Sequence, residues 1–154
     1  MRCVMTEINK SFYIRPARED DIDGIAELEA LCFSVPFTKK SLFDLFTNTS
    51  WHFFVAEAEG RVAGYISLYT ILDEKEIVNV CVHPDSRKCG MGAALVKAAL
   101  DLNRDAYKKI MLEVRVSNAG AIALYEKFGF LAVGVSKNHY SQPREDALLM
   151  NLEL

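Results

Sequence analysis

Apolar and polar positions alternate in several short segments of the chain, which is the spacing expected of half-buried β-strands. These segments are rich in β-branched and aromatic residues and are separated by turn residues such as Glu59-Gly60 and Asp73-Glu74-Lys75. The pattern predicts strands at the following residues: 11–17, 51–58, 61–72, 76–82, 108–116, 130–136 and 146–154.

Apolar residues three or four positions apart predict helices between these strands. The first helix follows the acidic residues 19–21 and ends before Pro36, and Thr38 is placed to cap a second, shorter helix. Two further helices are expected from about residue 90 to 104 and over residues 119–129. The order βααβββαβαββ predicts an α/β (α+β) fold, with a mixed, mostly antiparallel central sheet and helices on both faces.

The composition is that of an ordinary soluble globular protein, with 51% hydrophobic and 25% charged residues. No repeat, linker or low-complexity segment interrupts the chain, so we expect a single domain over residues 1–154. A chain of this length can bury about two-thirds of its unfolded surface. The net charge of −3 argues against nucleic-acid binding, because phosphate contacts require an excess of Lys and Arg on one face.

The cysteines and histidines form no metal-ligand spacing, and no CxxC pair is present. The cysteines have apolar or basic neighbours and are interpreted as small buried residues in a reducing compartment: Cys3, Cys32, Cys81 and Cys89. The histidines are expected to be ordinary surface or strand residues: His52, His83 and His139. No segment is long and apolar enough for a membrane span or a signal peptide, which predicts a cytoplasmic protein without membrane contact.

A glycine-rich turn joins the predicted strand at 76–82 to the helix that begins near residue 90. Its pattern is R-x-x-G-x-G, Arg87 to Gly92, which fits neither a P-loop nor a dinucleotide fingerprint. Glycines let a backbone approach a ligand closely, and the first amides of a helix are unpaired at the positive end of its dipole. The turn is therefore a candidate pyrophosphate site, to which Arg87 and Lys88 add positive charge. The alternative is a plain tight turn with left-handed glycines.

Glu113 lies in the middle of an apolar strand, between Leu112 and Val114, where a carboxylate is unusual. Alternation puts it on the same face as Arg115, so an ion pair between the two is one interpretation and a chemical role is the other. Tyr125 on the following helix also has two interpretations. It either packs in the core or supplies a reactive phenol.

Three further segments help to interpret the glycine turn: CFSVPFT from residue 32, LEVRVSNAGAIALYEKFGF at 112–130 and REDALLM at 144–150. Together with R-x-x-G-x-G after a strand, they resemble the GNAT acetyltransferases, and more specifically the RimI-type N-terminal (ribosomal-protein-alanine) acetyltransferases. The resemblance covers essentially the whole chain. It implies the GNAT fold and an N-acetyltransferase that uses acetyl-CoA as co-substrate and no metal.

The resemblance also implies roles for individual residues. Glu113 would take the proton of the attacking amine, and Tyr125 would donate a proton to the departing CoA sulfur. Asn118 would contact the cofactor near its thioester end. The strand before the turn would pair through its backbone with the pantetheine arm, at Val80, Cys81 and Val82.

The pyrophosphate would be held by the turn and the start of the next helix: Arg87, Lys88, Cys89, Gly90, Met91, Gly92 and Ala93. Cys89 departs from the polar or basic residue common at its position in the family. Because the implied contact is through the backbone, cofactor binding is expected to survive this difference.

The acceptor implied by the resemblance is the N-terminal alanine of a small-subunit ribosomal protein. An α-amine with a pKa near 8 is roughly a tenth neutral at pH 7, so it demands less of a base than a lysine with a pKa near 10.4. Two alternatives stay open: transfer to another amine (a lysine side chain, a polyamine or an antibiotic), and an acyl-CoA-binding module without turnover. Phe33, Phe37 and Tyr140 either line the acceptor groove or pack in the core.

Overall fold

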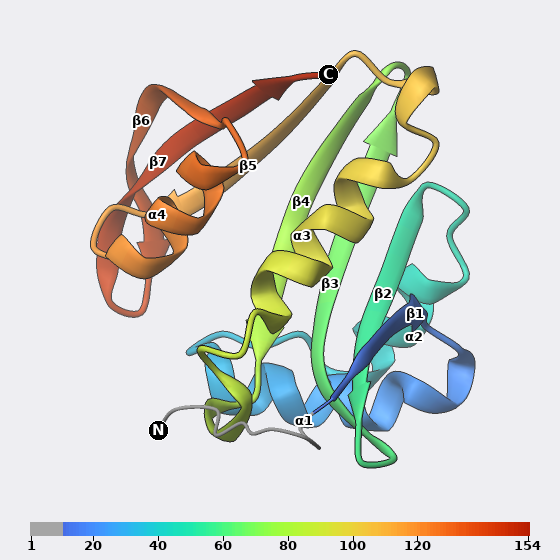
Figure 1. Cartoon of the computed structure of the whole chain (residues 1–154). Coiled ribbons are helices and arrows are strands. Elements are labelled where there is room, and N and C mark those ends of the chain that lie inside the picture. Colours follow the sequence, from blue (N-terminus) through green and yellow to red (C-terminus); the bar gives the residue numbers. More distant parts are fainter. Residues whose placement is uncertain (1–10) are drawn as a thin grey trace.

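A seven-stranded sheet in the order β1-β2-β3-β4-β5-β7-β6 forms the centre of the structure (Figure 1). The structure is a computed structural model that describes residues 11–154, so Cys3 and the N-terminal segment considered above lie outside the described residues. The elements are β1 (Tyr13–Pro16), α1 (Ile22–Cys32), α2 (Lys39–Phe46), β2 (Trp51–Ala58), β3 (Arg61–Ile71), β4 (Glu74–Val82), α3 (Met91–Asp101), β5 (Lys109–Arg115), α4 (Ala119–Lys127), β6 (Leu131–Ser141) and β7 (Arg144–Glu153). The predicted order βααβββαβαββ is confirmed.

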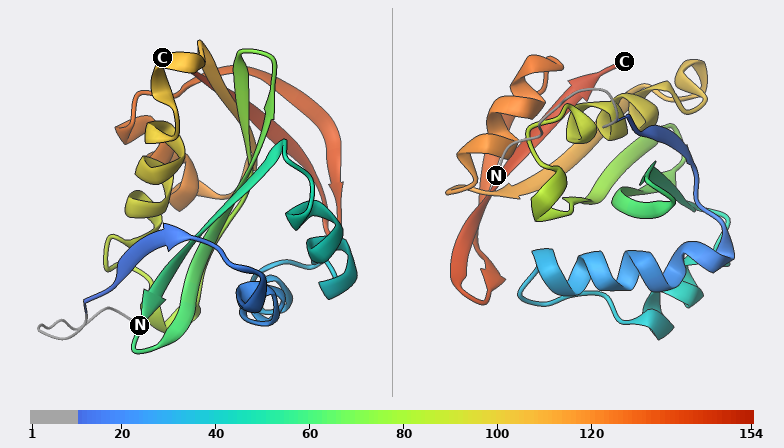
Figure 2. Two further views of the ribbon diagram at one scale, coloured as in Figure 1. Left: turned by 90° about the vertical axis from the view of Figure 1, so that its right-hand side faces the viewer. Right: turned by 60° about the horizontal axis from the view of Figure 1, so that its bottom comes forward.

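The sheet is mixed, as predicted: β4 and β5 run parallel, and the other neighbouring pairs of described strands are antiparallel. Figure 2 shows α1 and α2 on one face of the sheet and α3 and α4 on the other. Each face buries its own apolar cluster. Leu28 and Phe53 belong to the cluster under α1 and α2, and Leu95 and Phe130 belong to the cluster under α3 and α4. Among residues 11–154, no helix has both the length and the apolar character needed to cross a bilayer.

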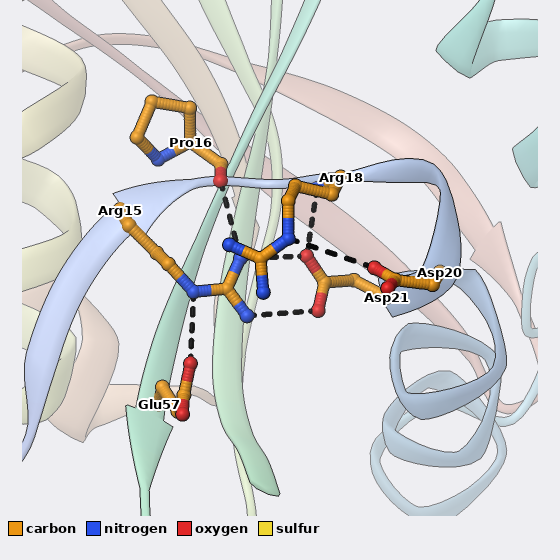
Figure 3. Close-up of polar contacts among 6 residues, drawn as sticks. All are labelled: Arg15, Pro16, Arg18, Asp20, Asp21 and Glu57. Carbon is orange, nitrogen blue, oxygen red and sulfur yellow. Dashed lines mark hydrogen bonds and ion pairs between the residues drawn. The ribbon is translucent and has the colours of Figure 1, made fainter. Parts of the chain in front are cut away.

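Arg15 ties the edge of the sheet to the start of α1 (Figure 3). Its guanidinium donates to both carboxylate oxygens of Asp21, at 2.8 and 2.9 Å, and its Nε donates to Glu57 Oε1 at 2.9 Å. Asp21 is buried and also accepts a hydrogen bond from the Arg18 backbone N–H at 2.7 Å. The hydrogen bonds from Arg15 hold the pKa of Asp21 below its ordinary value. These contacts fix the position of α1 against β1 and β2.

Lys75 corrects the sequence interpretation of residues 73–75 as a turn. β4 already begins at Glu74, and the Lys75 side chain is fully buried. Its Nζ donates to the carbonyl oxygens of Ala99 and Leu100 at 2.8 and 3.2 Å, and it lies 5.1 Å from the ring centre of Tyr107. A lysine can be buried here because the last turn of α3 offers it unpaired carbonyl acceptors. Burial lowers the pKa of Lys75 to about 8.

The divergence of β4 and β5 creates the space for a site. The two strands pair only where residues 74–77 of β4 meet residues 109–112 of β5. Beyond Ile77, β4 continues to Val82 while β5 turns away, as Figure 1 shows. β5 remains paired with β7 along its whole length. Among the described strands, the last residues of β4 therefore have a neighbour, β3, on one side only.

Candidate active site

A pocket of about 1170 Å³ lies where β4 and β5 diverge. Its walls come from the end of β4, the turn before α3, β5, α4 and the hairpin between β6 and β7. Most of the residues singled out from the sequence line it: Val80, Val82, Arg87, Lys88, Gly90, Gly92, Ala93, Glu113, Asn118 and Tyr125. The pocket thus brings together segments that lie far apart in the chain, from Cys32 to Pro143.

The exposed edge of β4 offers backbone groups to the pocket at every second residue. His83 donates its N–H to Ala63 O at 2.7 Å, on the β3 side. Backbone groups of successive strand residues point to opposite edges, so those of Val80 and Val82 face the pocket and those of Cys81 face β3. The Val82 carbonyl already accepts a hydrogen bond from Arg87 Nε at 3.0 Å. An extended ligand can therefore pair with β4 mainly through Val80.

The N-terminus of α3 is arranged for an anion. Gly90 immediately precedes the helix in the left-handed region, with φ 85° and ψ 6°, and no side chain of residues 11–154 caps the helix start. The first amides of the helix, from Met91 to Ala93, consequently have neither an intrahelical acceptor nor a capping side chain. A Cβ at Gly90 would meet no heavy atom within 4 Å, so the backbone is open to a ligand at this point. With Lys88 beside it, the turn fits a diphosphate.

Glu113 projects from β5 into the pocket and pairs with a residue that the sequence analysis did not connect to it. Its Oε1 lies 3.1 Å from Nε2 of His139 on β6. The alternative ion pair between Glu113 and Arg115 is wrong: Arg115 instead pairs with Glu145 on β7 at 3.2 Å. The Glu113 side chain is 38% exposed, so it is accessible to a ligand.

The position of Tyr125 is compatible with both interpretations, packing in the core and a phenol available in the pocket. Its ring packs edge-on against Phe130 at a centroid distance of 5.6 Å, and the residue is only 7% exposed. Yet it lines the pocket, and within the described part of the chain its hydroxyl has no hydrogen-bond partner. Burial, and to a smaller extent the neighbouring Tyr140, raises the pKa of Tyr125 to about 12. A buried hydroxyl without a partner is uncommon, and here it fits a hydrogen bond to a ligand.

Asn118 serves first as the cap of α4. Its Oδ1 accepts a hydrogen bond from the Ala121 N–H at 3.2 Å, and its position in the pocket wall places it across from β4. Three of the residues predicted to bind the cofactor do not line the pocket. Cys81 and Met91 are buried in the two apolar clusters, and Cys89 is half-buried outside the lining.

Two loops meet over the end of the pocket beyond Glu113. The Ser34 hydroxyl, which follows α1, donates to the Gln142 carbonyl at the tip of the β6–β7 hairpin. Arg115 donates to the carbonyls of Pro143 and Gln142, at 2.9 and 3.3 Å, and stacks over the ring of Tyr140 at 4.3 Å. This contact between the loops, defined by Ser34 and Gln142, is called the loop bridge below.

The residues considered for the acceptor groove divide between pocket and core. Phe33 and Tyr140 line the pocket near the loop bridge. Phe37 does not; it packs against the cluster under α1 and α2.

Glu76 and His139 are pocket residues that sequence reasoning missed. Glu76 is half-buried on β4, and burial, reinforced by the charge of Glu113, raises its pKa. The structure places Glu76 and Glu113 on the same face of the sheet, because Glu76 is paired with Met111, two residues before Glu113 on β5. Alternation within either strand does not give this register. No sequence signal existed for His139 either. Its placement depends on an irregularity in the β6–β7 register between Ser136 and Tyr140.

Cys32 is a further pocket residue, at the end of α1. Its Sγ lies 3.6 Å from an Arg87 guanidinium nitrogen and 3.7 Å from the Val82 carbonyl oxygen. Contact with the Cys81 thiol, together with Arg87, lowers the pKa of Cys32 to about 7. The same contact, and to a smaller extent burial, raises the pKa of Cys81, whose thiol donates to Leu28 O at 3.3 Å. Residues 11–154 contain no group of three or more His, Cys, Asp or Glu side chains that could hold a metal.

An open strand edge, an uncapped helix start and a carboxylate near a buried phenol define a site for an acyl-CoA and an acyl acceptor. Comparison with known proteins agrees with this class. Residues 22–130 match the acetyltransferase (GNAT) family, and the chain belongs to that family.

Individual relatives cover nearly the whole chain. It is 32% identical over 137 residues to the [ribosomal protein bS18]-alanine N-acetyltransferase of Escherichia coli (strain K12), which covers 87% of this chain and 92% of that protein. It is 39% identical over 140 residues to a Bacillus subtilis (strain 168) protein whose name assigns the same activity provisionally, covering 89% of this chain and 92% of that one. The crystal structure of the ribosomal-protein-S18-alanine N-acetyltransferase from Escherichia coli superposes with a TM-score of 0.85 at 30% identity, covering 93% of this chain and 94% of that one. The expected GNAT fold is thereby confirmed.

Proposed function

We propose that this chain transfers the acetyl group of acetyl-CoA to the N-terminal α-amine of a protein, with the alanine of ribosomal protein bS18 as the acceptor. The proposal is supported by relatives at 32% and 39% identity that are named for this reaction. The observation that carries it is the location of Glu113 and Tyr125 in the same pocket as the uncapped start of α3. We place the reaction in the cytoplasm, as the sequence predicts.

The co-substrate binds along the cleft between β4 and β5. Its diphosphate takes hydrogen bonds from the amides at the start of α3, and Lys88 adds a favourable charge. Its pantetheine arm lies along the open edge of β4 and pairs with the Val80 backbone. The thioester then reaches the narrow end of the cleft, between Glu113 on β5 and Tyr125 on α4.

The reaction is a direct attack of the amine on the thioester carbonyl. The nitrogen forms a bond to the carbonyl carbon, the carbon–sulfur bond breaks, and the amine gives up one proton, which Glu113 accepts directly or through a water. Roughly a tenth of an α-amine is neutral at pH 7. Deprotonating the rest costs little free energy, so a carboxylate such as Glu113 is a sufficient base.

Tyr125 stabilises the departing sulfur by donating a hydrogen bond. With its pKa raised to about 12, the phenol is a weaker acid than an alkyl thiol with a pKa near 8.5. Complete proton transfer from Tyr125 would cost about 5 kcal/mol, whereas a hydrogen bond to a thiolate is favourable. The thiolate therefore leaves with Tyr125 as donor and takes its own proton from water.

The test is acetylation of synthetic peptides, followed by mass spectrometry. A peptide with a free N-terminal alanine, taken from the start of ribosomal protein bS18, should gain one acetyl group. The same peptide with a blocked N-terminus and an internal lysine is the control. Modification of the control at a rate similar to the free peptide would favour a lysine acetyltransferase. No modification of any amine, despite acetyl-CoA binding by calorimetry, would favour a binding module.

A further inference from the structure

His139 is placed to interact with Glu113 and is not part of the apolar core. It comes from β6, and its Nε2 is 3.1 Å from Glu113 Oε1 on β5. Its ring packs edge-on against Tyr140 at 4.8 Å, and the side chain is 33% exposed. Its second ring nitrogen, Nδ1, lies 3.4 Å from the Ser136 hydroxyl on the outer side. One ring nitrogen therefore faces the pocket carboxylate and the other faces the protein surface.

The other charged groups near the pocket have contacts elsewhere, so His139 is the partner of the pocket carboxylates Glu113 and Glu76. Glu76 on β4 is near enough for His139 to lower its pKa, while burial and Glu113 raise it. Arg115 is engaged by Glu145, by the hairpin carbonyls and by the Tyr140 ring. The charge of Glu113 contributes to the raised pKa of Tyr140, after burial. Among the described residues in contact with Glu113, the imidazole is the group that can accept or carry a proton near neutral pH.

The proposed reaction gives Glu113 one proton per turnover, and that proton must leave before the next amine is attacked. An imidazole is in general a stronger base than a carboxylate by about two pKa units, so a proton passes readily from a carboxyl to a neighbouring imidazole. The exposed ring can then release a proton to water from Nδ1. One proton enters at Glu113 and one leaves at Nδ1, which leaves the ring protonated at Nε2. Exchange of the ring protons with water restores the tautomer with a free Nε2 before the next turnover.

We propose that His139 is a positioning residue for Glu113: it holds the carboxylate toward the acceptor amine and carries the accepted proton out to solvent. This inference rests on the proposed function. In general, an imidazolium beside a carboxylate forms an ion pair and makes the carboxylate a weaker base. Because Glu113 and His139 are 3.1 Å apart, we expect turnover to fall at low pH for a reason additional to protonation of the amine.

The experiment combines a pH profile with a double-mutant cycle. We expect His139→Gln to lower kcat for the alanine peptide by ~10-fold at pH 8, with the KM for acetyl-CoA unchanged. The ratio of kcat at pH 6 to kcat at pH 8 should be larger for the variant than for the wild type. In the Glu113→Gln background, which retains turnover because α-amines are part neutral at pH 8, His139→Gln should cost less than about twofold more.

Two controls separate this role from a structural one. His52→Gln changes a half-buried histidine of β2 outside the pocket and should leave kcat and its pH dependence unchanged. His139→Ala should regain rate when imidazole is added to the buffer, because the site is partly exposed. Equal losses from His139→Gln in both backgrounds, superimposed pH profiles, or no rescue by imidazole would overturn the inference while the proposed function stands. A wild type that acetylates no peptide would overturn the proposed function and this inference with it.

Discussion

The carboxylate of Glu29 accepts a hydrogen bond from Asn79 Nδ2 at 2.8 Å, which joins α1 to the part of β4 that lines the pocket. The same buried carboxylate accepts the Phe37 N–H at 2.8 Å and the Tyr65 hydroxyl. One side chain therefore positions the strand that lines the pocket and the loop that precedes α2. The loop bridge begins in that same loop, at Ser34.

Glu29→Gln should lower the free energy of unfolding by about 2–4 kcal/mol, because the amide group cannot accept from all three donors and leaves a buried donor unpaired. It should also raise the KM for the acceptor peptide, since the Phe37 loop loses an anchor. Urea denaturation and steady-state kinetics measure the two effects. Glu27→Gln, at an exposed position on the same helix, is the matched control and should change stability by less than about 0.5 kcal/mol. A variant as stable as this control would contradict the prediction.

Gly90→Ala should weaken acetyl-CoA binding by at least about tenfold, because it strains a left-handed residue at the start of α3 and places a methyl group in the space of the ligand. Gly60→Ala is matched in strain, since Gly60 has φ 75° and no atom within 4 Å of a Cβ, but it lies in the β2–β3 turn. Calorimetry with acetyl-CoA should show a loss of affinity for the first variant only. Equal affinities in both variants would mean that the ligand does not approach Gly90.

Tyr125→Phe should lower kcat by about 10- to 100-fold with little change in stability, because the ring keeps its contact with Phe130 and the hydroxyl has no hydrogen-bond partner among the described residues to lose. Thermal denaturation and single-turnover kinetics test the two parts. Tyr69→Phe on β3, outside the pocket, is the control for a generic loss of a hydroxyl. Should Tyr125→Phe unfold the protein or leave kcat unchanged, its role would be in packing alone.

Asp21→Asn should destabilise the protein by about 1–3 kcal/mol at pH 7, because the bidentate contact with Arg15 loses its charge. The pKa of Asp21 is lowered in the folded state, so its contribution is present above the ordinary value of 3.8 and is lost as the pH falls through the folded-state pKa. The stability difference between wild type and variant should therefore shrink below about pH 4. Urea denaturation at pH 7 and pH 3 measures it, with the exposed Asp23→Asn as control. A difference that is constant with pH would contradict the assignment.

Cys32 should react with iodoacetamide at a rate that is half-maximal near pH 7, because its pKa is lowered to about 7 and the thiolate is the nucleophile. Saturating acetyl-CoA should slow the reaction, since Cys32 lines the pocket. Peptide mapping should find Cys81 unlabelled, because it is buried and its pKa is raised. Labelling of Cys32 that acetyl-CoA leaves unchanged would place the ligand elsewhere.

Local patterns predicted the elements, whereas the sharing of one site by distant segments was implied by the family resemblance alone. The strand before residue 83 and the helix after Gly90 were evident from alternation and helical spacing, and the divergence of β4 from β5 opens a pocket at their junction. Glu113 stood out as a carboxylate within an apolar strand, and the structure places it in the pocket with Tyr125. The catalytic roles of these two residues stay predictions.

The features that the sequence did not reveal depend on contacts between residues far apart in the chain. Lys75 looked like a turn residue because the carbonyl groups that accept its hydrogen bonds, those of Ala99 and Leu100, belong to a helix more than twenty residues away. His139 looked like a surface residue because the length of β6 and its irregular register with β7 determine which way its ring points. Neither feature has a local pattern from which it could be read.

The buried amine of Lys75 has a consequence for how the protein responds to its ligand. It neutralises the negative end of α3 from within, at Ala99 and Leu100, while no side chain in the described part of the protein caps the opposite end at Gly90. The dipole of α3 therefore has an opposite charge at both ends only when an anion binds at the start of the helix. Occupancy by acetyl-CoA should accordingly slow amide hydrogen exchange along all of α3, well beyond the turn that the ligand touches.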